Sequence, residues 1–273
     1  MRNLLFLLML CFGFFVVGQH KGTTYQSAKN SKQADFVYVY DGTEGLVQGE
    51  GQNVKGLLVE VMRKFEEHVQ QTDGISVTSE FRLQKDFKQF MSEIKMSEGG
   101  IFGLSNVSIT EERKKNYQFS PSYMSNISVL VTNNATPSLS ALNAISTDFA
   151  GKTAYAVGGS TYYTRLASIK ANHFPDMKII ELASTDEVVE KVINDDNSFT
   201  VVDLVYYMAN RTNTSFRRHA VGDNADDMLG IIMPLKNDWA SAFEKFFLTF
   251  KKSDDYRNIV IEHMGKGALR MID

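Results

Sequence analysis

The chain has 273 residues, of which 43% are hydrophobic and 11% aromatic, so it is long and apolar enough for one large domain or two small lobes with a full core. Its formal net charge is −3 at pH 7 and its basic residues are not gathered in one tract, which argues against a nucleic-acid partner. The single cysteine, Cys11, lies in an apolar N-terminal segment, so the rest of the chain has no thiol for disulfides, metal ligation or nucleophilic catalysis.

The N-terminus has the pattern of a secretory signal. Arg2 gives a short positive region, and Leu4 to Val17 is an apolar run that ends in small residues. We expect residues 1–18 to be a cleaved signal peptide of an exported, periplasmic protein. A retained membrane anchor is the alternative, but the run is shorter than the ~20 residues that a spanning helix needs. The polar residues 19–33 are predicted to form a flexible leader.

Strands and helices alternate after this leader. Asp35 to Tyr40 and Ile75 to Phe81 have the pattern of strands, and the apolar spacing from Gly56 to Val69 predicts a helix between them. A helix over Phe87 to Ile94 and a short strand over Ile101 to Leu104 follow. This order predicts a parallel sheet flanked by helices.

A candidate binding motif follows the third predicted strand. Thr110 is suited to cap the next helix, and Arg113 in its first turn can bind a carboxylate through two parallel hydrogen bonds. Asn106 and Ser108 lie close enough along the chain to add polar partners. These residues indicate a carboxylate-binding corner, with a surface arginine on a strand–helix loop as the alternative.

A glycine turn opens a helix in the second half of the chain. Gly158 and Gly159 precede Ser160 and Thr161, and such a turn gathers free backbone N–H groups that suit an anion. An ordinary helix cap is the alternative.

Asp203 ends a short apolar strand, Phe199 to Val202. Because α/β folds bind ligands beyond the carboxyl ends of their strands, this carboxylate is a candidate partner for a ligand ammonium. The alternative is a helix N-cap, a role also predicted for Thr185 before the preceding helix. The later aromatic stripe, which includes Trp239 and Phe243, is predicted to be core and not a cofactor site.

The block from Ser108 to Tyr123, Ser-Ile-Thr-Glu-Glu-Arg-Lys-Lys-x-x-x-Phe-Ser-x-x-Tyr, resembles the signature of bacterial extracellular solute-binding proteins of the polar amino-acid family. These are the two-lobed receptors that feed ABC transporters. The segments Gly151 to Thr161 and Asp254 to Ile259 are also similar to that family. The resemblance implies that a ligand's α-carboxylate is held by Arg113, Ser108, Asn106, Ser160 and Thr161, and its α-amino group by Asp203.

The end of the site that would receive a ligand side chain departs from the family. Members often carry aromatic and proline residues after the first strand, whereas this chain has Asp41-Gly42-Thr43-Glu44-Gly45. Asp41 and Phe87 complete the candidate ligand-binding residues. Phe87 is a candidate for stacking on a ligand side chain, with ordinary core packing as the alternative.

The resemblance implies an α/β fold of the type II periplasmic-binding kind, in which two lobes, each a mostly parallel sheet flanked by helices, are joined by two hinge crossings. Lobe 1 is expected to comprise residues 34–125 and 227–273, and lobe 2 residues 126–226. The expected protein is a monomeric receptor that closes on an amino acid or similar small carboxylate and presents it to a membrane permease, with no cofactor and no metal.

Other functional classes are less favoured. The five histidines are scattered without metal-ligand spacing, and residues 103–107 lack the second glycine of a nucleophile elbow, so we do not expect an enzyme. Two alternatives stay open, a periplasmic ligand-sensing module and a dehydratase-like enzyme on the same fold.

Overall fold

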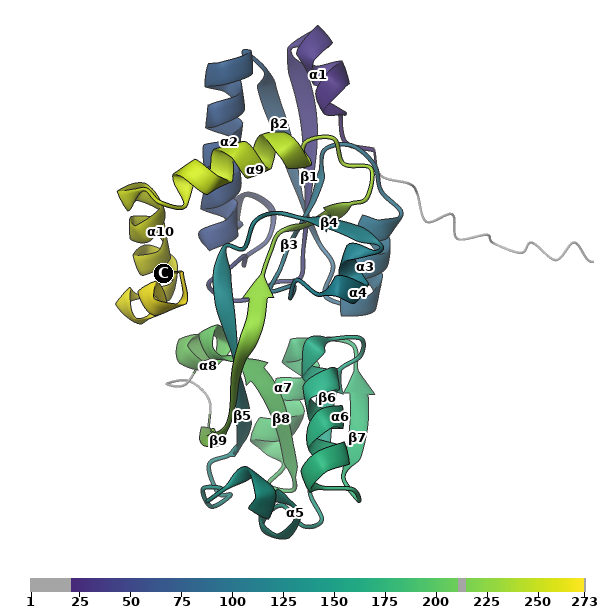
Figure 1. Ribbon diagram of the computed structural model, residues 1–273, viewed down its shortest axis with the longest axis vertical. Helices are drawn as coiled ribbons and strands as arrows, with labels where there is room; N and C mark the ends of the chain where they lie inside the picture. Colours follow the sequence, from purple (N-terminus) through teal and green to yellow (C-terminus); the bar gives the residue numbers. More distant parts are fainter. Residues whose placement is uncertain (1–20, 211–214, 273) are drawn as a thin grey trace, which may run out of the picture.

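The computed structural model describes residues 21–210 and 215–272. Two five-stranded sheets with helices packed on them form two lobes, one above the other along the long axis of the molecule (Figure 1). The predicted signal peptide and Cys11 lie outside the described residues.

The upper sheet in Figure 1, that of lobe 1, has the strand order β2-β1-β3-β10-β4. Its first three strands are parallel, and β10 runs antiparallel to both of its neighbours. Its strands are β1 (Gln33–Tyr40), β2 (Ser76–Leu83), β3 (Ile101–Leu104), β4 (Tyr117–Phe119) and β10 (Ile232–Pro234). The helices of this lobe are α1 (Tyr25–Ser31), α2 (Leu57–Asp73), α3 (Phe87–Lys95), α4 (Glu111–Lys114), α9 (Ala240–Phe250) and α10 (Asp254–Met264), with 3₁₀ turns η1 (Gly51–Asn53) and η3 (Lys266–Met271).

The lower sheet, that of lobe 2, has the order β7-β6-β8-β5-β9. Its strands β7, β6 and β8 are parallel, whereas β5 is antiparallel to β8 and β9. Its strands are β5 (Met124–Asn133), β6 (Thr153–Val157), β7 (Lys178–Leu182), β8 (Ser198–Asp203) and β9 (Phe216–Leu229). Its helices are α5 (Ile145–Asp148), α6 (Thr161–His173), α7 (Thr185–Asn194) and α8 (Leu204–Asn210), with the 3₁₀ turn η2 (Leu142–Ala144).

The chain crosses between the lobes along β5 and β9, which are paired. Met124 lies opposite Leu229 and Ser125 opposite Met228, and the register shifts between Asn126 and Leu130. These crossings fall close to the two positions predicted from the sequence, although the exact division into lobes stays a prediction.

The core of lobe 1 is rich in aromatic side chains, as the sequence predicts for the stripe on α9. Trp239 and Phe243 are fully buried and pack against Phe36 and Phe65. The sheet and this helix therefore enclose one apolar cluster, and the aromatic stripe is accounted for by packing.

The prediction of a flexible leader over residues 19–33 is wrong where the structure describes it. Tyr25–Ser31 forms helix α1, capped by Thr24, whose side chain accepts from Ser27 N. The Tyr25 ring lies 4.7 Å from that of Trp239, and Ala28 is fully buried. A helix this short is marginal alone and is stabilised by docking on the lobe, a contribution that local composition does not reveal.

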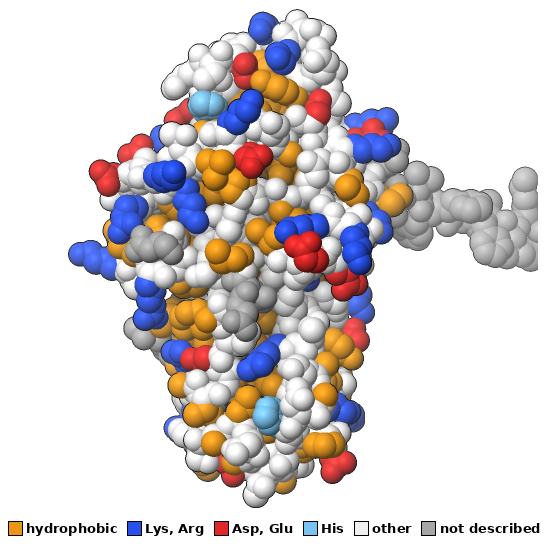
Figure 2. All heavy atoms as spheres, viewed as in Figure 1, with side chains coloured by type: hydrophobic (Ala, Val, Ile, Leu, Met, Phe, Trp, Pro, Cys, Tyr) orange, Lys and Arg blue, Asp and Glu red, His pale blue; other side chains and the backbone are white. Residues whose placement is uncertain are grey.

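Acidic and basic side chains occur together on both lobes of the face seen in Figure 2. Among the described residues, no helix combines the length and the apolar character that a membrane crossing requires.

Candidate functional site

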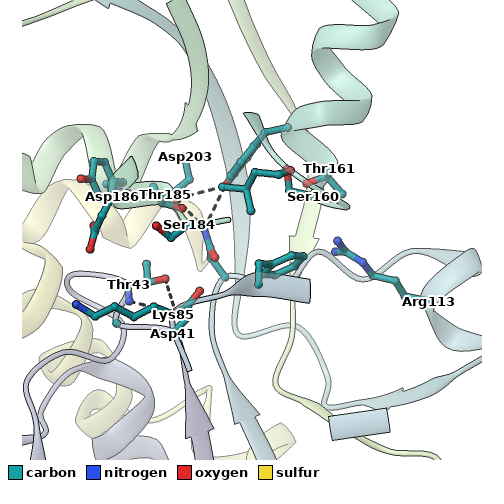
Figure 3. Close-up of a pocket in the computed structure, with 16 residues that line it drawn as sticks. Asp41, Thr43, Lys85, Arg113, Ser160, Thr161, Ser184, Thr185, Asp186 and Asp203 are labelled. Atoms are coloured by element: carbon teal, nitrogen blue, oxygen red, sulfur yellow. Dashed lines mark hydrogen bonds between the residues drawn. The ribbon is translucent and has the colours of Figure 1, made fainter. Parts of the chain in front are cut away.

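A cleft lies between the lobes and is lined by side chains from both, with ≈ 40 Å³ of enclosed space in the arrangement seen here. Figure 3 shows side chains reaching into it from both lobes. The lining residues from lobe 1 are Asp41, Gly42, Thr43, Lys85, Phe87, Asn106 and Arg113. Those from lobe 2 are Val157, Ser160, Thr161, Tyr162, Ser184, Thr185, Asp186, Asp203 and Tyr206.

Strand register brings Asp41 to the cleft. Tyr40 at the end of β1 pairs with Leu104 at the end of β3, so the two following residues, Asp41 and Ser105, are neighbours. Ser105 Oγ donates to Asp41 Oδ2 at 2.5 Å, and Thr43 donates to Oδ1 from its hydroxyl at 2.8 Å and its backbone N–H at 3.1 Å. Burial raises the pKa of the Asp41 carboxyl despite these donors.

Asp203 lies at the carboxyl end of β8 with its side chain 2% exposed. Its Oδ1 accepts from the backbone N–H of Tyr206 at 2.6 Å, which is the capping contact that the sequence offered as the alternative role. Its Oδ2 accepts from Asn106 Nδ2 at 2.8 Å and Tyr162 Oη at 3.2 Å. Burial raises the pKa of this carboxyl as well, and the hydrogen bonds that it accepts oppose this rise in part.

Arg113 lies at the opposite end of the cleft. Thr110 caps α4 as predicted by accepting from Arg113 N at 3.2 Å. The guanidinium donates to Ser108 O at 3.0 Å in its own lobe and to Gly159 O at 3.2 Å in lobe 2. Its carbon lies 5.7 Å from the centre of the Phe87 ring, within range of a cation–π contact. Phe87 therefore positions the arginine side chain as well as lining the cleft.

The glycine turn before α6 brings hydroxyls to the same end. Ser160 caps the helix by accepting from Tyr163 N at 3.2 Å, and its own hydroxyl donates to Val157 O at 2.7 Å. Thr161 Oγ1 lies 3.1 Å from Ser108 Oγ across the cleft. Ser108 does not line the cleft itself but lies directly behind Thr161 and Arg113.

Further contacts join the two lobes beside the cleft. Phe87 N–H donates to Ala183 O at 3.1 Å, and Lys88 Nζ lies 2.8 Å from Glu181 Oε2. Both side chains of the ion pair are exposed, so the pair adds little to stability. The backbone bond is the more specific of the two contacts.

Sequence reasoning missed one end of the cleft. Ser184, Thr185 and Asp186 lie after β7, and Lys85 lies opposite them on lobe 1 (Figure 3). Ser184, not Thr185, caps α7 by accepting from Glu187 N, because Ser184 is the residue with extended backbone. The rule that placed Asp203 at a strand end applies equally to β7 and identifies these residues.

Tyr162 is another lining residue that sequence reasoning missed. It is 8% exposed, and its hydroxyl contacts Asn106 at 3.2 Å and Asp203. The local sequence predicts only an aromatic side chain on a helix. It does not indicate the two contact partners, which are 56 and 41 residues away. Among residues 21–210 and 215–272, no cluster of His, Cys, Asp and Glu is suited to hold a metal ion.

The model of the bacterial extracellular solute-binding proteins, family 3, matches residues 45–266 of the chain. The chain belongs to this family. The arginine motif, the glycine turn and Asp203 all lie within the matched residues. The family resemblance predicted from these motifs is therefore confirmed.

Solved structures show the same fold as this family-3 protein at low sequence identity. A substrate-binding protein of an ABC uptake transporter from Streptococcus pneumoniae, with bound histidine, has a TM-score of 0.70 and 18% identity over 89% of this chain and 97% of its own. The arginine-, lysine-, histidine-binding protein ArtJ from Geobacillus stearothermophilus has a TM-score of 0.68 and 16% identity over 85% and 96% of the two chains. The predicted two-lobe periplasmic-binding fold is confirmed.

An arginine-specific periplasmic binding protein from Salmonella typhimurium, STM4351, has a TM-score of 0.66 and 14% identity over 84% of this chain and 99% of its own. No curated protein matches this family-3 chain by sequence.

Proposed function

We propose that this solute-binding protein captures an amino acid or similar small carboxylate in the cleft between its lobes and delivers it to an ABC importer. The observation that carries the proposal is the placement of Arg113 from lobe 1 and Asp203 from lobe 2 in the lining of one cleft. A guanidinium at one end and a buried carboxylate at the other suit the two charges of a zwitterion.

Arg113 is the carboxylate partner in this proposal. Its contacts to the backbone carbonyls of Ser108 and Gly159, one from each lobe, help to fix the plane of the guanidinium. The Thr161 hydroxyl lines the same end of the cleft and supplies a neutral donor, and the Ser108 hydroxyl lies 3.1 Å behind it. A carboxylate bound there contacts both lobes and so favours the closed arrangement through its differential contacts.

Asp203 is the partner for an α-amino group, and Asp41, Lys85 and Asp186 are the charged residues at the end that would receive a ligand side chain. This mixture of charges supports a polar or charged ligand side chain. The neighbouring structures that bind histidine or arginine support the same ligand class. The protein is proposed to act as an exported monomer that meets a membrane permease, and no catalytic step is proposed.

A thermal-shift screen of the purified protein against the L-amino acids and small carboxylates tests the proposal, because a ligand that binds only the folded state raises the melting temperature. We expect a concentration-dependent rise for at least one L-amino acid or small carboxylate, and its loss in Arg113→Ala. A screen in which none of these compounds shifts the melting temperature, or in which the shift survives in Arg113→Ala, contradicts the proposal.

A further inference from the structure

Asn106 of lobe 1 contacts Asp203 of lobe 2, and both side chains line the cleft. Asn106 follows β3 in lobe 1, and its Nδ2 donates across the cleft to Asp203 Oδ2 at 2.8 Å and to Tyr162 Oη at 3.2 Å. Its Oδ1 lies 3.2 Å from Ser105 Oγ, whose single hydroxyl hydrogen is directed to Asp41 Oδ2 at 2.5 Å. The amide orientation follows from these partners, since only the nitrogen can donate to a carboxylate.

The hydrogen-bonding capacity of Asp203 is nearly filled by the protein itself. A carboxylate accepts about four hydrogen bonds, and three are supplied by Tyr206 N, Asn106 Nδ2 and Tyr162 Oη. Two of these three donors reach the same oxygen, Oδ2. An α-ammonium group has three donors to satisfy and would have to share that oxygen or displace the Asn106 amide.

We infer that Asn106 is a specificity-determining residue, whose amide occupies the ammonium-binding face of Asp203 and makes the cleft less selective for the amino group of its ligand. This inference rests on the proposed function. The ligand class that it favours is small 2-substituted carboxylates. A 2-hydroxyl group needs only one acceptor from the protein, so at this face of Asp203 it loses less binding free energy than an ammonium group does.

The same contact changes how closure depends on the ligand. Asn106 belongs to lobe 1 and Asp203 to lobe 2, so their hydrogen bond already joins the lobes at the point where a ligand's amino group would join them. A ligand shifts a conformational equilibrium only through contacts that it adds in one state. The ligand's amino group therefore adds less free energy to lobe closure in this protein than it would if residue 106 had no amide.

Matched ligand pairs test the inference. Calorimetry with L-alanine and L-lactate, L-aspartate and L-malate, L-glutamate and L-2-hydroxyglutarate, and L-histidine and L-imidazolelactate gives, for each pair that binds, the ratio of amino-acid to hydroxy-acid affinity. In Asn106→Ser, which shortens the side chain and releases Oδ2, we expect that ratio to rise by roughly tenfold or more, the scale of one charge-assisted hydrogen bond.

Two further variants complete the design. Asn134→Ser makes the same substitution at an exposed position of lobe 2 and should leave the ratio unchanged. Tyr162→Phe removes the other donor to Oδ2 while keeping Asn106, so it should raise the ratio by a smaller factor even if Asn106→Ser folds poorly. Melting temperatures of all variants separate lost folding from altered selectivity.

The failures of the inference and of the proposed function are distinct. If amino acids bind but the ratio in Asn106→Ser and Tyr162→Phe equals that of the parent protein, the inference is overturned and the proposed function stands. If no amino acid or small carboxylate binds the parent protein or any variant, the proposed function fails and the inference fails with it.

Discussion

The side-chain oxygens of Ser108 and Thr161 lie 3.1 Å apart, although one residue follows the sheet of lobe 1 and the other begins helix α6 of lobe 2. The Ser108 carbonyl accepts a hydrogen bond from Arg113, and Thr161 follows the glycine turn. This pair therefore lies where the two halves of the proposed carboxylate site meet. Changes at this point test closure and binding together.

Thr161→Val removes the hydroxyl and keeps the shape of the side chain. We expect affinity for the bound carboxylate to fall by roughly 3- to 10-fold, the scale of one neutral hydrogen bond, as measured by calorimetry. Thr164→Val is the matched control, because Thr164 is exposed on the same helix. An equal loss in both variants would show that the helix, and not the Thr161 hydroxyl, is responsible.

Arg113→Lys keeps the charge but loses the planar fork that binds a carboxylate through two bonds. Affinity is expected to fall by roughly 10- to 100-fold, with little change in melting temperature, because the lysine retains a charge at a half-buried position. Lys114→Ala is the control, since Lys114 is exposed and its charge pairs with that of Glu111 on the same helix. Unchanged affinity in Arg113→Lys would contradict bidentate recognition.

Asp203→Asn removes a buried charge while keeping an oxygen that can accept from Tyr206 N. Because burial raises the pKa of the Asp203 carboxyl, the folded state favours its neutral form, and ionisation lowers stability as the pH rises through the folded-state pKa. We therefore expect the free energy of unfolding at pH 7 to change by less than about 1 kcal/mol, if Asn106 turns its amide to match.

The same variant is expected to lose at least roughly tenfold in affinity for L-amino acids and much less for their 2-hydroxy analogues. Urea unfolding and calorimetry measure the two effects separately. Equal losses for both ligand types would remove Asp203 from amino-group recognition.

His219 makes stability depend on pH. It is 1% exposed, its Nδ1 accepts from Leu139 N at 2.9 Å, and its Nε2 lies 2.8 Å from Thr132 Oγ1. Burial, followed by the charges of Arg217 and Lys152, lowers its pKa from 6.5 to about 4. The neutral ring is favoured in the folded state, so stability is lost as the pH falls from 6.5 towards 4.

Between pH 7 and pH 5 this residue should cost about 2 kcal/mol of unfolding free energy, at ~1.4 kcal/mol per pKa unit. Urea unfolding at the two pH values measures the loss. His219→Gln keeps a donor and an acceptor but does not titrate, so the difference should shrink in that variant. A pH dependence that is the same in both proteins would assign the effect to other groups.

Asp238 holds the first helix on the lobe. Its two side-chain oxygens accept from Tyr25 N at 2.9 Å and Gln26 N at 3.2 Å, at the N-terminus of α1. Asp238→Ala should lower the free energy of unfolding by about 1 kcal/mol, as for other lost helix caps, and increase proteolysis around residues 22–32. Asp176→Ala, at an exposed site of lobe 2, serves as the control. Unchanged proteolysis would mean that other contacts, such as those of Tyr25 with Trp239 and Asp73, are enough to hold the helix.

Local patterns predicted the elements that carry the site. The end of β3, the Thr110 cap and the strand that ends at Asp203 each depend on a few consecutive residues, and the structure has all three. Their convergence followed from the rule that strand ends share one edge of a sheet.

Contacts between distant residues were not predictable in the same way. The Asn106–Asp203 bond spans 97 residues and depends on how one lobe is placed on the other. Helix α1 was missed for a related reason, since its stability comes from Trp239 and Asp238, more than 200 residues away. Neither segment shows its partner in its own composition.

The pairing of β5 with β9 has a consequence for how solute enters. Both covalent links between the halves of the molecule are neighbouring strands of one ladder, held together where Met124 faces Leu229, and the irregular register comes directly after. The halves therefore share a single pivot, and a change of backbone conformation in this two-stranded ribbon would turn one whole lobe on the other.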